Sequence, residues 1–210
     1  MDIPDMKREG LIKEVLDLEW EMFTNVNSAN GRASCQDDTG TFMIMRRAQA
    51  GIWSADTLTS YLNDLRAAKY DKRNLMAEKY ARMMEATFPE EYEILEKQLP
   101  AVSDRSRELA REIVKYHLKW SMEASGKYPK FFSLGRPVSG NTDRSNSIEN
   151  YLKSELLTYS EETLELCLKD TIAAADNDTN LSIEILKNTA RSYGFDSLDA
   201  IEEKFSGEGK

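Results

Sequence analysis

Apolar residues recur at intervals of three and four positions along most of this chain, which is the spacing of one face of an α-helix. Clear segments of this kind occupy residues 11–23, 42–53, 54–65 and 75–87. No stretch alternates apolar and polar residues over the length of a strand. We therefore predict an all-α protein with eight or nine helices. Five later helices are expected to begin near residues 103, 147, 160, 180 and 197, and a further short helical segment near residue 89.

Helix-capping residues stand at several of these expected starts. Ser54, Asn74 and Ser103 each precede an apolar helical stripe, where a side-chain oxygen can accept a hydrogen bond from a free backbone N–H group. Two segments, 25–40 and 127–144, are instead rich in Gly, Asn, Ser, Asp or Pro. They are predicted to be long loops.

The chain resembles itself at an offset of 106 positions. Residues 53–78 align with residues 159–184 without a gap, and ten of the 26 aligned positions are identical. A weaker match lies in the same order along the chain, where Gly31-Arg32 recurs as Gly135-Arg136. Convergence of amphipathic helices is one explanation for this pattern. Duplication is the other, and it predicts a single domain of two related halves, about 8–102 and 103–205, packed with pseudo-two-fold symmetry.

Charge and composition indicate the cellular location of the protein and the classes of partner that it disfavours. The 210 residues include 28 Lys and Arg and 37 Asp and Glu, so the net charge is −9 and nucleic-acid binding is disfavoured. The first ten residues lack the apolar core of a signal peptide, and no apolar run approaches the roughly 18 residues that span a membrane. The two cysteines form no disulfide framework. These features predict a cytoplasmic protein without a membrane association.

Several chemistries are excluded by the scarcity of their residues. His117 is the single histidine, which is too few for a paired di-iron site or a Cys/His zinc site. It lies on an apolar helix face between Ile113 and Trp120, where a core role is favoured over a catalytic base. No Walker A or Rossmann glycine pattern is present. We therefore predict no metal site and no cofactor.

The segment 30–38 contains the highest concentration of charged and potentially reactive side chains in the sequence. Cys35 lies three residues after Arg32 and shortly before a predicted helix, and both neighbours stabilise a thiolate. Asp37 and Asp38 oppose this effect. The segment is consistent with a reactive thiol or an anion-binding loop. It is also consistent with a buried cysteine and an arginine that ties the loop to the body, and this structural interpretation is favoured.

Two polar residues interrupt apolar stripes at positions that are equivalent under the repeat. Gln49 lies between Met45 and Ile52, and Glu155 follows Tyr151. A buried polar group needs hydrogen-bond partners. The pair is therefore expected either to face a shared central cavity or to satisfy nearby backbone and arginine groups.

Several runs of residues along the chain together form a recognisable fingerprint. They are Glu19-Trp20-Glu21, Gly31-Arg32-Ala33-Ser34-Cys35-Gln36, Met45-Arg46 with Gln49 and Trp53, Asn74-Leu75 with residues 78–84, Gly135-Arg136-Pro137, and Tyr151-Leu152 with Glu155-Leu156. Through these runs the chain resembles a bacterial family described as domain of unknown function 4125. The likeness covers nearly the whole sequence, and it implies an α-helical, bacterial, cytoplasmic protein without implying an activity. Because Arg32, Cys35 and Gln36 lie within this fingerprint, the resemblance strengthens them as candidate site residues.

Our leading hypothesis is a protein that binds a small anionic molecule in a polar pocket between the halves, with or without catalysis. Arg32 and Arg136 would neutralise the anion, and Gln49, Tyr151 and Glu155 would supply hydrogen bonds. Gln36 and Arg46 complete the ligand-binding set, and Cys35 would be a nucleophile if it is exposed. The alternative is a non-catalytic helical module that binds a protein partner. Direct pairing of the polar groups without a void would favour the alternative.

Overall fold

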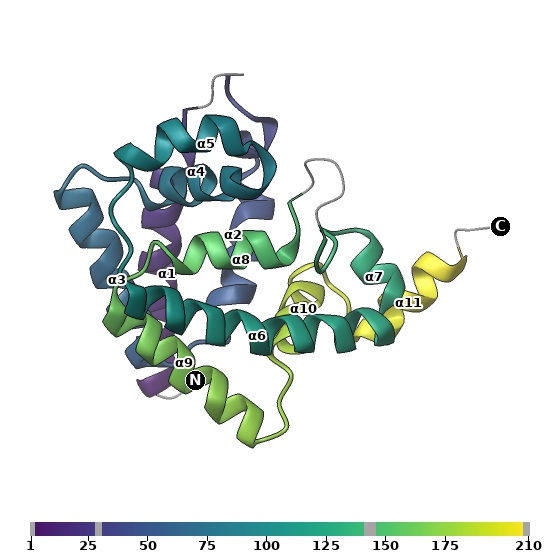
Figure 1. The fold of residues 1–210 in the computed structure, drawn as a ribbon. Coiled ribbons are helices and arrows are strands. Elements are labelled where there is room, and N and C mark those ends of the chain that lie inside the picture. The colour runs from purple at the N-terminus through teal and green to yellow at the C-terminus, as the bar shows by residue number, and fades with distance from the viewer. Residues whose placement is uncertain (1–2, 28–30, 141–145, 208–210) are drawn as a thin grey trace.

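Every regular element in the computed structural model, which describes residues 3–27, 31–140 and 146–207, is helical (Figure 1). The described residues form eleven α-helices and two short 3-10 helices, so the all-α class is confirmed, whereas the predicted eight or nine helices are too few. In chain order the elements are α1 (Ile3–Thr24), η1 (Ser34–Asp37), α2 (Thr39–Ala50), α3 (Ala55–Tyr70), α4 (Leu75–Thr87), α5 (Pro89–Leu95), η2 (Glu96–Gln98), α6 (Asp104–Lys127), α7 (Pro129–Ser133), α8 (Ile148–Leu156), α9 (Glu161–Asp176), α10 (Leu181–Ser192) and α11 (Leu198–Gly207).

Short helices lie inside both segments that were predicted to be loops. η1 falls within residues 25–40, and α7 falls within residues 127–144. Pro129 stands in the first turn of α7, where the missing N–H group of proline breaks no helical hydrogen bond. Such one-turn helices are too short to show an apolar periodicity in the sequence. Residues 28–30 and 141–145 of the two segments lie outside the described part of the chain.

The predicted capping residues begin the predicted helices. The hydroxyl oxygen of Ser54 accepts a hydrogen bond from the backbone N–H of Thr57 at 3.2 Å, and Ser103 caps α6 in the same way. Asn74 caps α4 through its amide oxygen, while its amide nitrogen donates to the backbone oxygen of Met22 at 2.7 Å. This second bond ties the start of α4 to the end of α1.

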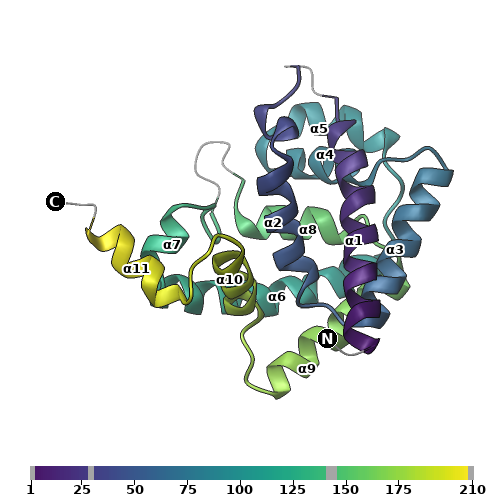
Figure 2. The ribbon, with the colours of Figure 1, turned by 180° about the vertical axis from the view of Figure 1, so that it is seen from behind.

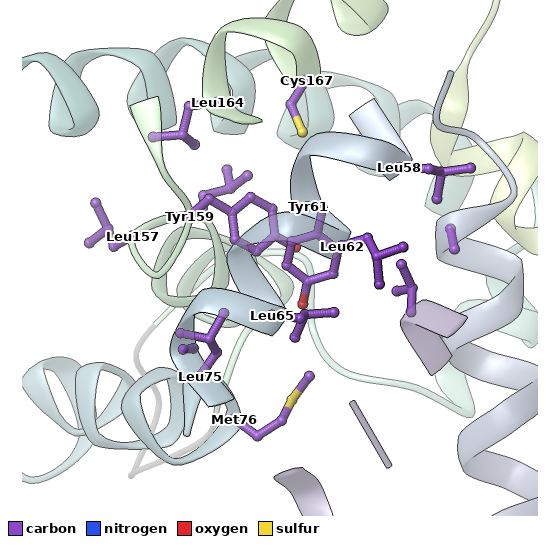
Figure 3. Packing of buried hydrophobic residues seen from close by; sticks show 14 of the residues in the cluster. Leu58, Tyr61, Leu62, Leu65, Leu75, Met76, Leu157, Tyr159, Leu164 and Cys167 are labelled. Carbon is purple, nitrogen blue, oxygen red and sulfur yellow. The ribbon is translucent and has the colours of Figure 1, made fainter. Parts of the chain in front are cut away.

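The main hydrophobic core lies among α1, α3, α4, α6, α8 and α9. Its centre is the buried face of α3, where Leu58, Tyr61, Leu62 and Leu65 carry the stripe that the sequence predicts (Figure 3). The rings of Tyr61 and Tyr159 meet there with centroids 4.5 Å apart. Burial of these large side chains is the dominant stabilising contribution to the fold.

A second, smaller core joins α7, α10 and α11 with the end of α6. Tyr128, Ala190, Leu198 and Ile201 are its buried members, and several phenylalanines pack around them. Figures 1 and 2 show these helices at one end of the molecule, where α6 runs from the main body toward them. The chain therefore has two apolar clusters that are linked by one long helix.

Helices from the two halves of the sequence pack in three pairs, namely α3 with α9, α2 with α10 and α4 with α8. The backbone N–H of Ser54 donates to Asp170 at 2.9 Å, and the backbone N–H of Ser160 donates to Asp64 at 3.0 Å. Each serine caps one helix of the α3–α9 pair and each aspartate belongs to the other helix. Within the described ranges, no helix has the length and apolar composition that a bilayer span requires.

We predict that Asn74→Ala lowers the free energy of unfolding by about 2 kcal/mol, because it removes both a helix cap and the hydrogen bond that joins the start of α4 to the Met22 carbonyl of α1. Urea unfolding followed by circular dichroism measures the change. Asn25→Ala is the matched control, since the Asn25 side chain is exposed and, among the described residues, bonds only the Glu21 carbonyl at the end of α1. Its expected effect is below about 0.5 kcal/mol. Equal losses in the two variants would contradict the role of the α1–α4 bond.

Candidate functional site

Four charged side chains from four helices meet inside the protein. Glu19 comes from α1, Arg46 from α2, Lys79 from α4 and Glu155 from α8, and each is at most 8% exposed. Charges of this kind are costly to bury unless they are paired. Two carboxylates and two cations balance one another, so the cluster is neutral as a whole.

Arg46 is the centre of this cluster. Its Nε donates to Glu19 at 2.8 Å, and its two terminal nitrogens donate to the two oxygens of Glu155 at 2.9 and 3.2 Å. The same nitrogens also bond the second oxygen of Glu19 and the amide oxygen of Gln49. All five N–H donors of the guanidinium are thereby used. Burial alone would lower the pKa of Arg46, but Glu155 and Glu19 raise this pKa well above its usual range.

Tyrosines complete the hydrogen bonding of the carboxylates. The hydroxyl of Tyr61 donates to Glu19 at 2.7 Å, and the hydroxyl of Tyr159 donates to Glu155 at 2.9 Å. Burial would raise the pKa of Glu155, but Arg46 and Lys79 outweigh this effect and lower the pKa to about 2. Glu155 is therefore ionised throughout the physiological pH range.

Lys79 connects the cluster to Tyr151. Its ammonium group lies 3.3 Å from Glu155 and donates a hydrogen bond to the hydroxyl oxygen of Tyr151 at 2.8 Å. The guanidinium carbon of Arg136 lies 5.0 Å from the centre of the Tyr151 ring. Tyr151 therefore stands between a buried cation and an exposed one.

A cavity of about 920 Å³ lies beside the cluster. One side contains Arg46, Gln49, Tyr151 and Glu155, and Arg136 also contributes to the lining. The remaining walls are mostly apolar and come from α6, α7, α8, α9, α10, α11 and their connections. The cavity is thus mainly apolar, and the polar groups of the charge cluster lie on one side of it. It adjoins both hydrophobic cores, and α2 supplies the wall from the first half.

His117 also lines this cavity, next to Trp120 with ring centroids 5.4 Å apart. Burial lowers the pKa of His117 to about 4, so the imidazole is neutral at physiological pH. In the described part of the chain, no group of three or more His, Cys, Asp or Glu side chains is arranged to hold a metal ion.

The structure places three of the expected site residues elsewhere. Arg32, Cys35 and Gln36 are not part of the cavity lining, so Arg32 does not join Arg136 there. Gln36 is buried and donates to the backbone oxygens of Phe23 and Val26 at 2.8 and 2.9 Å. These bonds hold the loop against the end of α1.

Arg32 reinforces the same loop. It donates to Asp37 at 2.9 Å, to the backbone oxygen of Thr24 at 3.0 Å and to the backbone oxygen of Gln36 at 2.8 Å. Cys35 is exposed beside these bonds. The contacts of Arg32 and Gln36 therefore hold this loop against the rest of the protein.

Glu19, Lys79, Tyr61 and Tyr159 belong to the cluster although the sequence reasoning did not select them. Glu19 follows Val15 by four positions on the buried face of α1, and Lys79 shares a buried face of α4 with Leu75. The sequence could have indicated Glu19 and Lys79, because each is a polar residue on an otherwise apolar helix face. The same feature identified Gln49 and Glu155 as candidates.

The family described as "Protein of unknown function (DUF4125)" matches residues 9–203 of this sequence. The chain belongs to the DUF4125 family. No curated protein and no solved structure matches this DUF4125 protein. The buried cluster and the cavity lie within the matched range, so the function of this DUF4125 protein must be argued from their chemistry.

We predict that Glu155→Gln destabilises the protein by roughly 3 kcal/mol near neutral pH, because Arg46 and Lys79 lose a buried counter-charge. The folded pKa of about 2 is below the ordinary 4.5, so Glu155 stabilises the fold above about pH 4.5, and this contribution is lost as the pH falls toward 2. Urea unfolding of both proteins at about pH 6.5 and pH 3 tests this, and the difference should shrink at the lower pH. A difference independent of pH would contradict the assignment.

The two cysteines should differ strongly in reactivity. Cys35 is exposed, whereas Cys167 is buried and its pKa is raised by that burial, so less thiolate is present at Cys167. We expect iodoacetamide to label Cys35 in the folded protein and Cys167 only after unfolding in urea, as measured by intact mass and peptide mapping. Equal labelling rates in the native protein would show that α9 opens readily.

Proposed function

We propose that this protein binds a small, largely apolar molecule carrying an anionic group in the cavity beside Arg46 and Tyr151. The observation that carries the proposal is the cavity itself, whose 920 Å³ is within the size of small-molecule sites. Apolar walls with a few polar groups in one region are typical of such sites, because the walls supply affinity and the polar groups supply orientation.

The charges around the cavity favour an anion. The chain as a whole has a net charge of −9, yet the lining contains three cations, Arg46, Arg136 and Lys204, and two carboxylates, Glu155 and Asp170. Glu19 and Lys79 behind the lining cancel each other. By this count, the described residues of the lining carry one more positive than negative charge.

We also infer that the two halves are a duplicated unit related by a pseudo-two-fold axis. The inference is supported by the reciprocal packing of α2 with α10 and α4 with α8, and by the bonds from Ser54 to Asp170 and from Ser160 to Asp64. At the offset of 106, the members of each serine pair and each aspartate pair are equivalent.

The duplication explains why the cavity lies mainly in the second half. At the same offset, Tyr61 corresponds to Cys167 and Lys79 corresponds to Ile185. Both first-half side chains are fully buried members of the charge cluster, and both second-half side chains are smaller and line the cavity. The first half fills the space that the second half leaves open, which supports one ligand site per chain.

Arg46 and Glu155 use their hydrogen bonds mainly on each other and on neighbouring protein groups. Their role in this proposal is to fix the polar region of the cavity rather than to react. We place this function in the cytoplasm, as the sequence features predict, and in a bacterium, as the family resemblance implies.

Filling the cavity should abolish binding. We expect the fluorescent probe 1-anilinonaphthalene-8-sulfonate, which has an apolar body and one anionic group, to saturate at one molecule per chain. Ile185→Trp places a larger side chain into the cavity and should weaken binding at least about tenfold, as measured by fluorescence titration.

Ile172→Trp is the matched control, because Ile172 is 41% exposed on α9 and does not line the cavity. It should bind the probe like the unmodified protein. Near-ultraviolet circular dichroism verifies that both variants keep native packing. Equal binding by the two variants would place the probe outside the cavity and refute the proposal.

A further inference from the structure

We infer that the ligand is an amphipathic monocarboxylate whose carboxylate is held by the hydroxyl of Tyr151 and the guanidinium of Arg136, while its apolar body fills the cavity. This inference rests on the proposed function and adds the position and chemical nature of the anionic group.

The hydrogen bonding of Tyr151 supports this role. Its hydroxyl oxygen already accepts a hydrogen bond from Lys79 at 2.8 Å, so the hydroxyl is oriented and its own proton is available. Among the residues that the structure describes, none accepts a hydrogen bond from this hydroxyl. Donation from Lys79 polarises the hydroxyl and strengthens it as a donor. An incoming carboxylate oxygen would complete the bonding of Tyr151.

Arg136 provides the matching charge. It is exposed, it lines the cavity, and its guanidinium packs against the ring of Tyr151 at 5.0 Å. Arg136 forms no ion pair with any residue in the described ranges. Arg46 is different, because its five donors are occupied by Glu19, Glu155 and Gln49. Lys204 also lines the cavity, but its ammonium group lies over the ring of Phe195, 5.3 Å from the centroid. The cation that lies beside Tyr151 and whose donors no described residue uses is therefore Arg136.

The charge balance selects a monoanion with a long apolar body. An excess of one positive charge in the described lining favours one negative charge on the ligand, and the largely apolar remainder of the lining suits an apolar chain or ring system. A more polar ligand would leave hydrogen-bonding groups against apolar walls without partners, which is unfavourable.

Calorimetric titration with decanoate and with decanamide tests the inference, because the two probes share the same chain and differ in the charge of the end group. The unmodified protein should bind decanoate about tenfold more tightly than decanamide, the preference that a charge-assisted hydrogen bond supplies. Tyr151→Phe and Arg136→Gln should each bind decanamide normally and lose most of the preference for decanoate.

Matched controls exclude general effects of the substitutions. Tyr70→Phe and Arg111→Gln change exposed residues that do not line the cavity, and both should keep the preference for decanoate. Arg136 is exposed, so its replacement does not threaten the fold, and the thermal midpoint verifies the Tyr151 variant.

The outcomes separate the two proposals. Equal binding of decanoate and decanamide, unchanged in Tyr151→Phe and Arg136→Gln, would overturn the carboxylate site and leave the cavity proposal intact. A preference for decanoate that persists in both variants would also overturn the assignment to these residues. Failure of both probes to bind the unmodified protein would refute the cavity proposal itself.

Discussion

The ion pairs of Arg46 with Glu19 and Glu155 constrain the interior of this protein more than any other contact. They join α1, α2 and α8 within the body of the molecule, and Lys79 adds α4 through Glu155. An unpaired charge at this depth is strongly destabilising, so the four helices must hold the relative positions that keep the charges matched. Apolar packing drives the helices together, and the charge network restricts how they can be arranged.

The same network gives the neighbouring cavity its polar region. Because Arg46 and Glu155 are already saturated by protein groups, they supply a rigid boundary, and the groups beside them remain available. Tyr151 is the link, since Lys79 orients its hydroxyl from within while Arg136 lies against its ring. The structural core and the proposed ligand site would thereby share one set of charges without competing for hydrogen bonds.

The two halves use equivalent positions differently. Where the first half places Tyr61 and Lys79, the second half places Cys167 and Ile185, and the second half also adds the small core of α7, α10 and α11. Smaller side chains at the same depth create space that the first half lacks. This difference is consistent with a duplicated unit in which one copy stabilises the body and the other forms the cavity.

Periodicity and capping residues were sufficient to predict the helical class and most helix starts, because both depend on neighbours within one or two turns. Ser54, Asn74 and Ser103 cap their helices as the sequence indicated. The same reasoning identified Gln49 and Glu155 as polar residues on apolar stripes. It missed α7, whose single turn is too short for a periodic signal.

Which side chains would meet could not be read from local patterns. Arg32 and Arg136 occupy similar Gly-Arg pairs, yet one bonds Asp37 in a loop and the other packs on Tyr151 at the cavity. Glu19 and Arg46 are 27 positions apart, and Arg46 and Glu155 are 109 positions apart. Contacts over such separations depend on how the helices pack together. The sequence alone therefore decides which of the longer segments are helical and marks some of their inward-facing polar residues, such as Glu155. The partners of those residues are decided by tertiary packing, because buried charges and cavities exist only where several helices converge.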